Sequence, residues 1–153
     1  MDQATKVFME YAAAFEQTYL DDDWSRLTPY FAEDANYKVL GGPMACEIYG
    51  RNAIFTGLKK SLDGFDRRFS ERRIELTDGP RVVETDDGHE VSIGWIVTYQ
   101  YGDAPRLVLP GRSAFKIANG EIVAMRDEYD DKETESANAW MLRYGEGLDG
   151  SYV

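Results

Sequence analysis

Hydrophobic residues in the first third of the chain recur at helical spacing. Over residues 4–20 they stand three, four or one position apart, which predicts an amphipathic helix. Its apolar positions are Val7, Phe8, Tyr11, Ala12, Phe15, Tyr19 and Leu20. The acidic run 21–23 supplies an N-cap for a second, shorter helix, which Pro29 ends within about one turn. A third helix is predicted over residues 51–63, where Gly64 stops it.

Elsewhere the hydrophobic period is two, which is typical of strands. A short strand is predicted over residues 34–40. Further strands are predicted at 73–76, from 82 onward, and over 90–101, 106–117 and 121–129, with turns at 77–80, 86–88, 102–105 and 119–120. Pro110-Gly111 inside one strand indicates a bulge or a sheet edge.

The order of these elements indicates the fold class. Two or three helices come first and an antiparallel meander follows, which is typical of an α+β fold. We expect one domain over residues 1–153. The segment 132–153 is predicted to hold a short helix around 137–143 and then a flexible, glycine-rich end.

The last strand carries the clearest candidate for chemistry. Alternation places Val123, Met125, Asp127 and Tyr129 on one face, which is the more apolar face and therefore the expected interior. A carboxyl group among apolar neighbours has a raised pKa unless a donor or cation compensates it, and it then suits general acid/base catalysis. The alternative is that Asp127 only accepts hydrogen bonds from a nearby loop or from Arg112.

Aromatic residues form a stripe on the strand 90–101. Trp95 and Tyr99 share one face, which either lines a pocket or forms a dimer interface; the sequence leaves both open. On the next strand, Ser113 lacks the context of a nucleophile elbow, so we expect it to serve as a hydrogen-bonding group of the pocket. Aromatic residues make up 13% of the chain, which suits a pocket for a flat or cyclic apolar molecule.

Charge and composition exclude several classes. The chain has 17 basic and 28 acidic residues and a net charge of −11, which disfavours nucleic acid and anionic membranes as partners. One cysteine and one histidine exclude an internal disulfide and a multi-histidine metal site. We therefore expect no metal and no organic cofactor. No apolar run reaches ~18 residues, and no basic region precedes an apolar one at the start, so we expect a cytoplasmic protein.

Four short segments give the chain a family resemblance: 30–35 (YFAEDA), 49–54 (YGRNAI), 119–123 (NGEIV) and 126–130 (RDEYD). Together with the order of elements over residues 4–131, they resemble the NTF2-like superfamily, in particular its SnoaL-like branch of polyketide cyclases, limonene epoxide hydrolase, ketosteroid isomerase and relatives. The resemblance implies a cone-shaped fold, in which a curved antiparallel sheet wraps around the N-terminal helices and leaves an interior pocket. It also implies a homodimer formed through the outer face of the sheet.

The resemblance carries over only some functional residues. Asp127 stands where several of these enzymes have a functional aspartate, and Tyr37 matches a pocket tyrosine of the epoxide hydrolases. Val39 replaces their water-holding asparagine, and their Arg-x-Asp pair is missing from the strand 90–101. Phe15 stands near the position of the oxyanion tyrosine of ketosteroid isomerase. The resemblance therefore does not select a reaction.

The sequence leads to two hypotheses of different classes. The first is an enzyme that uses Asp127, with Tyr37, as a general acid/base on a cyclic, largely hydrophobic substrate. Its expected substrate-binding residues are Phe15, Trp95, Tyr99, Ser113, Met125 and Tyr129. The alternative is a non-catalytic small-molecule-binding or dimerisation module of the same fold.

Overall fold

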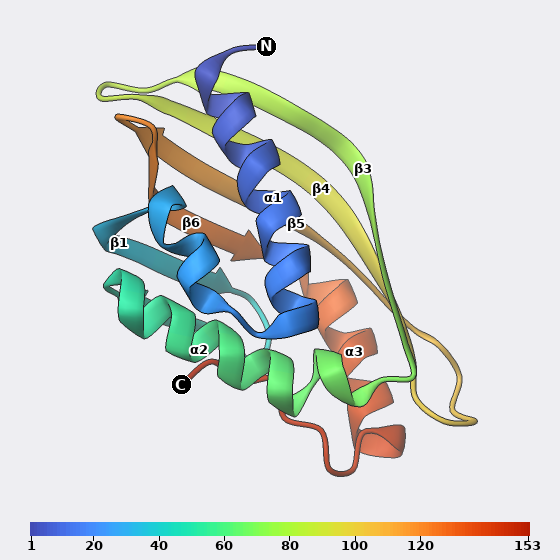
Figure 1. The fold of residues 1–153 in the computed structure, drawn as a ribbon. Coiled ribbons are helices and arrows are strands. Elements are labelled where there is room, and N and C mark those ends of the chain that lie inside the picture. The colour runs from blue at the N-terminus through green and yellow to red at the C-terminus, as the bar shows by residue number, and fades with distance from the viewer.

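A curved, six-stranded sheet forms the scaffold of the molecule (Figure 1). The computed structural model describes all residues 1–153. The strands are β1 (Phe31–Leu40), β2 (Cys46–Tyr49), β3 (Glu71–Glu84), β4 (His89–Gln100), β5 (Leu107–Ala118) and β6 (Glu121–Glu128). Their order in the sheet is β2-β1-β6-β5-β4-β3. The expected α+β class is confirmed.

The sheet is mixed rather than wholly antiparallel as expected. Strands β3 to β6 form the antiparallel meander that the turn signals predict, but β1 pairs with β6 in parallel. No hairpin joins these two strands, so no turn signal in the sequence fixes their relative direction. The short strand β2, which was not predicted, pairs with β1 at the edge of the sheet.

Three α-helices complete the architecture: α1 (Gln3–Asp21), α2 (Arg51–Gly64) and α3 (Asp131–Tyr144). Helix α1 crosses the concave side of the sheet, α2 runs beside β1, and α3 packs near β5 at one end (Figure 1). The apolar face of α1 buries Val7, Phe8 and Tyr11, as its periodicity predicts. No helix is long and apolar enough to span a bilayer.

The predicted second helix is a short 3-10 helix, η1 (Trp24–Tyr30). The Asp23 carboxylate caps it by accepting a hydrogen bond from the backbone N–H of Ser25, as expected of the acidic run. Pro29 lies inside this helix, and β1 begins directly after it, three residues earlier than predicted.

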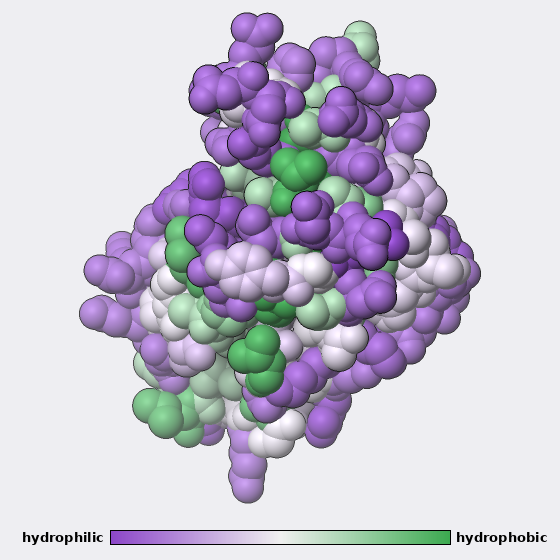
Figure 2. All heavy atoms as spheres, turned by 90° about the vertical axis from the view of Figure 1, so that its left-hand side faces the viewer, coloured by the Kyte–Doolittle hydropathy of each residue, from purple (hydrophilic) through white to green (hydrophobic).

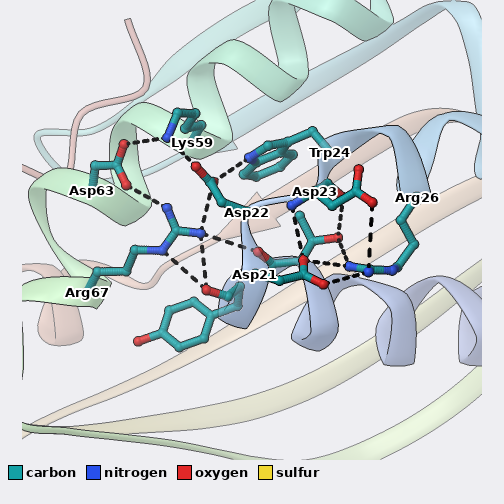
Figure 3. Close-up of polar contacts among 10 residues, drawn as sticks. Asp21, Asp22, Asp23, Trp24, Arg26, Lys59, Asp63 and Arg67 are labelled. Carbon is teal, nitrogen blue, oxygen red and sulfur yellow. Dashed lines mark hydrogen bonds and ion pairs between the residues drawn. The ribbon is translucent and has the colours of Figure 1, made fainter.

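A polar network joins the end of α1 to α2 (Figure 3). Asp22 pairs with Lys59 at 2.6 Å and with Arg67 at 3.1 Å. Arg67 also donates to two carbonyl groups in the last turn of α1, those of Thr18 and Tyr19. The acidic run therefore has a structural role: it helps to fix α1 against α2.

Strand β3 differs from its prediction. The residues 77–80 were expected to form a turn between two strands, but β3 continues through them, paired with β4 on both sides. The register shifts around Asp78, where Gly79 adopts a φ of 84°. The glycine and proline therefore interrupt the ladder locally without reversing the chain, because β4 is long enough to pair with both halves.

Pro110 lies where the sheet can accommodate it. Strand β5 pairs with β4 along its whole length, but its pairing with β6 begins only at Arg112. The segment that contains Pro110 therefore has a free edge on the side of β6. Of the two predicted alternatives, a bulge or a sheet edge, the structure shows the edge.

The expected flexible tail is instead packed. Helix α3 begins at Asp131, earlier than predicted, and the residues that follow it return to α2. Ser61 donates to the carbonyl of Gly150 at 2.6 Å, and the N–H of Asp149 donates to the carbonyl of Gly64 at 2.9 Å. Hydrogen bonds to backbone atoms do not require hydrophobic side chains at regular spacing. The pattern of hydrophobic residues in the sequence therefore could not reveal these contacts.

The surface is largely hydrophilic. Figure 2 shows the face that lies on the left of Figure 1, where hydrophilic side chains cover most of the area and hydrophobic ones form small patches. This agrees with the strongly acidic composition.

Candidate active site

A cavity of about 350 Å³ lies between α1, α2 and the concave face of the sheet. Eighteen of its 24 lining residues are hydrophobic. The eight residues singled out from the sequence all line it: Phe15, Tyr37, Trp95, Tyr99, Ser113, Met125, Asp127 and Tyr129. Alternation gave the inward face of Met125, Asp127 and Tyr129, whereas Tyr37 was named from the family resemblance and Phe15 belongs to the helical pattern of α1.

Asp127 accepts two hydrogen bonds in this cavity. The Tyr37 hydroxyl donates to Oδ2 at 2.5 Å, and the Ser113 hydroxyl donates to Oδ1 at 2.6 Å. The indole N–H of Trp95 donates in turn to Ser113 Oγ at 2.8 Å. Because an indole nitrogen only donates, the Ser113 proton must point toward Asp127. Each carboxylate oxygen thus has one donor and keeps further lone-pair capacity for a ligand.

Strand pairing positions these three partners. Asp127 on β6 lies opposite Ser113 on β5 and beside Val39 on β1, so Tyr37 is two residues away on the same face. The three functional groups come from neighbouring strands of one sheet. Their spacing is therefore set by the backbone ladder and not by loops.

Gly111 makes room for Trp95. The two residues lie opposite each other on β5 and β4, and a Cβ atom at Gly111 would come within 2.5 Å of the indole ring. The absence of a side chain lets the ring lie over the strand and reach Ser113. This explains the glycine that the sequence analysis could read only as a bulge or edge signal.

Burial sets the protonation behaviour of the site. It raises the pKa of Asp127, while the hydrogen bonds from Ser113 and Tyr37 act in the opposite direction. Burial, together with the nearby Asp127 carboxylate, raises the pKa of Tyr37 well above its ordinary value. Tyr37 therefore stays neutral and donates, whereas Asp127 holds a proton more readily than an exposed aspartate.

Two alternatives left open by the sequence can now be decided by position. The side chains of Trp95 and Tyr99 line the cavity, so this face of β4 is the inner one. Arg112 points away from Asp127 and pairs with Glu128 at 3.4 Å and Asp130 at 2.9 Å. It is therefore not a partner of Asp127.

The predicted alternation fails at the start of the last strand. Ile122 was expected on the outer face but is fully buried, whereas Val123, expected inward, is only partly buried while still packing against the core. The register between β5 and β6 shifts near Ile117. The shift changes the alternation by one position before Met125. The inward placement of Met125, Asp127 and Tyr129 is unaffected because they follow it.

Several cavity residues were missed from the sequence. Tyr152, in the supposedly flexible tail, packs edge-on against Tyr37 with ring centroids 5.4 Å apart. The Tyr11 hydroxyl contacts the sulfur of Met125 at 3.7 Å. Periodicity identified Tyr11 as a core position but gave no sign of its polar contact, and nothing in the tail marked Tyr152.

A charged cluster was also missed. Glu16, Asp66 and Arg72 line the same cavity, and Arg72 pairs with both acids. Each comes from a different element and stands alone in the sequence, so no local motif could have found them. No set of three or more His, Cys, Asp or Glu side chains is arranged to hold a metal ion.

A curved sheet over helices, with a hydrogen-bonded aspartate in a largely apolar cavity, is the architecture of an NTF2-like domain. The SnoaL-like domain family matches residues 10–125, and the chain belongs to this family. No curated protein matches the chain.

Solved structures agree on the fold. Bal32a from a soil-derived mobile gene cassette is 24% identical, with a TM-score of 0.62 over 90% of this chain and 95% of that one. A polyketide cyclase candidate from Xanthomonas campestris pv. campestris is 23% identical, with a TM-score of 0.53 over 82% and 91%. An LEH-like epoxide hydrolase from M. tuberculosis is 17% identical, with a TM-score of 0.58 over 90% and 91%. These identities support the shared fold alone.

Proposed function

We propose that the protein is a small-molecule enzyme in which Asp127 acts as general acid/base on a cyclic, largely hydrophobic substrate. The observation that carries the proposal is a buried carboxyl group with two fixed donors in an apolar cavity. Aldol-type cyclisation, isomerisation, dehydration and hydrolysis can each use such a group as general acid/base, and catalysis of this kind requires no metal or organic cofactor.

The geometry supports a simple proton cycle. Ionised Asp127 takes a proton from a substrate carbon or from a water on a free lone pair, and later returns it to the product. Tyr37 and Ser113 stabilise the ionised form, while burial raises its proton affinity. The two effects oppose each other, and this balance suits a group that must both accept and release a proton.

Val39 bears on which of these reactions is favoured. It lies beside Asp127 in the sheet and is 1% exposed, so no amide stands there to hold a water molecule. Proton transfer at a carbon next to a carbonyl group needs no such water. We therefore favour cyclisation or isomerisation over epoxide hydrolysis.

The experiment is hydrogen–deuterium exchange of 2-tetralone in D₂O, followed by NMR. This cyclic ketone has acidic protons next to its carbonyl group, so exchange reports the first proton transfer whatever the later reaction is. We expect wild-type protein to accelerate exchange and Asp127→Asn to lower the rate by about 10²–10⁴-fold while keeping the fold. Full exchange activity in Asp127→Asn would refute the role of Asp127.

The alternative function is a non-catalytic binding module. This alternative is favoured because the chain lacks residues that the related enzymes use in their reactions. The main example is Val39, which replaces the water-holding asparagine of the epoxide hydrolases. A ligand that raises Tm without being changed chemically, together with no exchange of 2-tetralone by wild-type protein, would support this alternative.

We also propose a homodimer formed through the outer face of the sheet. A groove of about 430 Å³ on that face contains Arg112 and Arg126 together with Asp78, Glu128 and Asp130. Arg112 and Arg126 already pair with Glu128 and Asp130 within the chain, so a second copy related by a two-fold axis can cover these four side chains without bringing an unpaired charge into the interface. Sedimentation velocity at micromolar concentration is expected to give a dimer, and a species of only 17.4 kDa would contradict it.

A further inference from the structure

A second polar cluster lines the cavity away from Asp127. Arg72 Nε lies 2.9 Å from Asp66 Oδ2, and Arg72 Nη1 lies 3.1 Å from Glu16 Oε2. The Tyr99 hydroxyl also donates to Asp66 Oδ2, at 3.2 Å. These residues come from α1, β3, β4 and the 3-10 helix η2 (Asp66–Arg68), so the cluster closes the space between α1 and the edge of the sheet.

Arg72 is held rigidly. Its side chain is 9% exposed, and its guanidinium group stacks on the ring of Tyr19 at 4.5 Å from the centroid. Two of its three nitrogens are engaged by carboxylates, and Nη2 has no acceptor in the chain. A fixed arginine with a free donor, in the lining of a cavity, is a group prepared to bind a ligand atom.

The cluster lies on a different part of the cavity wall from the proposed catalytic group. Ser113, which bonds Asp127, lies opposite Ile93 on β4, whereas Arg72 lies opposite Tyr99, six residues further along the strand. Because the sheet is curved (Figure 1) and both sets of side chains line the same cavity, the polar groups themselves are closer to each other than their positions along β4. Hydrophobic side chains such as Trp95 and Val97 line the cavity between them.

The charges of the cluster limit what it can bind. Arg72 is already paired with two acids, and burial raises the pKa of one of them, Asp66. The cluster therefore has no excess positive charge while Glu16 is ionised: it is negative when Asp66 is also ionised and neutral when Asp66 holds a proton. An anionic ligand group would meet the carboxylates of Glu16 and Asp66 without a spare cation, whereas a purely apolar group would leave the Nη2 donor buried and unpaired.

We propose that Arg72, held by Asp66 and Glu16, is a second ligand-binding subsite that accepts an uncharged oxygen, a carbonyl or hydroxyl group, at the far end of an elongated apolar ligand. The inference deepens the proposed function and rests on it only in assuming that the same ligand also reaches Asp127. It makes Arg72 a specificity-determining residue and not a catalytic one.

Three biphenyl probes of similar size test the subsite: 4-acetylbiphenyl, 4-ethylbiphenyl and biphenyl-4-carboxylate. Their dissociation constants are measured by equilibrium dialysis, which needs no turnover. We expect the ketone to bind wild-type protein about tenfold or more tightly than the hydrocarbon, as one hydrogen bond to a charged donor provides. The carboxylate is expected to bind no more tightly than the hydrocarbon.

Substitutions at Arg72 test whether this residue causes the tighter binding of the ketone. Arg72→Met removes every hydrogen-bond donor at this position. Arg72→Lys keeps a positive charge to pair with Asp66 but loses the planar set of guanidinium donors. Because Arg72→Lys leaves no unpaired carboxylate, at least this variant is expected to fold. Both are expected to lose the preference for the ketone, whereas the control Arg106→Met, at an exposed arginine outside the cavity lining, keeps it. Glu16→Gln, at a half-exposed side chain, is expected to improve binding of the carboxylate because it removes one opposing charge.

Three results would overturn the subsite. They are tighter binding of the carboxylate than of the ketone by wild-type protein, survival of the ketone preference in both Arg72 variants, and no binding of any probe. Asp127→Asn separates this proposal from the catalytic one. Loss of proton exchange with the ketone preference intact supports both proposals, whereas exchange that persists in Asp127→Asn removes only the catalytic role.

Discussion

Asp127 is ionised at neutral pH only at a cost in folding free energy. Because its folded pKa is raised above the ordinary value, the penalty is absent below the unfolded pKa of about 3.9, grows as the pH rises through the folded pKa, and is complete above it. A neutral side chain at this position avoids that penalty. The residue thus trades stability for proton transfer.

We therefore expect Asp127→Asn to be more stable than wild-type protein at pH 7.5, with the advantage shrinking toward pH 4. A gain of ~1 kcal/mol would raise Tm by about 2–4 °C in a chain of this length. Thermal unfolding at both pH values measures it. The control is Asp130→Asn: Arg112 lowers the pKa of Asp130, so this variant has no stability to gain at pH 7.5. An advantage of Asp127→Asn that is largest at pH 4 would contradict the raised pKa.

At the scale of elements, the pairing of β4 with β5 sets the hydrogen bonds of the site. Trp95 rests on Gly111 and thereby reaches Ser113, which orients its proton toward Asp127. A side chain on the glycine would push the indole ring away, since the ring is held between packed neighbours.

Gly111→Ala is expected to destabilise the protein by about 1–3 kcal/mol, the usual cost of overpacking, and to slow proton exchange. Urea unfolding and the 2-tetralone assay measure the two effects. In the Trp95→Phe background the smaller ring leaves room for the new methyl group, so the same substitution should cost much less. Equal costs in both backgrounds would show that the glycine serves another purpose.

The sequence predicted the elements better than their arrangement. Turn signals located the meander from β3 to β6, and alternation placed Met125, Asp127 and Tyr129 in the cavity, because both depend on local geometry. The parallel pairing of β1 with β6 and the continuation of β3 through Gly79 depend on contacts between distant segments. The cluster around Arg72 was missed for the same reason: its members meet only in the folded chain.

At the scale of the whole molecule, the segment after α3 completes the wall of the cavity. Tyr152 packs on Tyr37, while Ser61 and Gly64 of α2 bind the backbone of residues 149 and 150. Gly57 of α2 allows this approach, because a Cβ atom there would lie 2.8 Å from the carbonyl oxygen of Tyr152.

Removing residues 149–153 is expected to lower the free energy of unfolding by about 2–4 kcal/mol. The deletion removes the packing of Tyr152 on Tyr37 and leaves the Ser61 hydroxyl and the Gly64 carbonyl of α2 without their partners. Thermal and urea unfolding measure the loss. Val153→Ala, at a side chain that is 73% exposed, is the matched control and should leave Tm unchanged. An unchanged Tm after the deletion would mean that the segment does not pack in solution.

The backbone of the segment 149–153 is hydrogen-bonded to α2 and not to the sheet. The shape of the ligand space and the geometry of the proton-transfer groups therefore depend on different parts of the protein. Asp127, Tyr37 and Ser113 stand on three adjacent strands, so their mutual geometry is as stiff as the sheet, whereas the opposite wall belongs to α2 and the segment bonded to it. Substitutions in that wall, apart from Tyr152 on which Tyr37 packs, can widen or narrow the space for a ligand without disturbing the groups that handle the proton. An engineer seeking a new substrate would therefore vary α2 and residues 149–151, and leave Tyr152 and the three strands as they are.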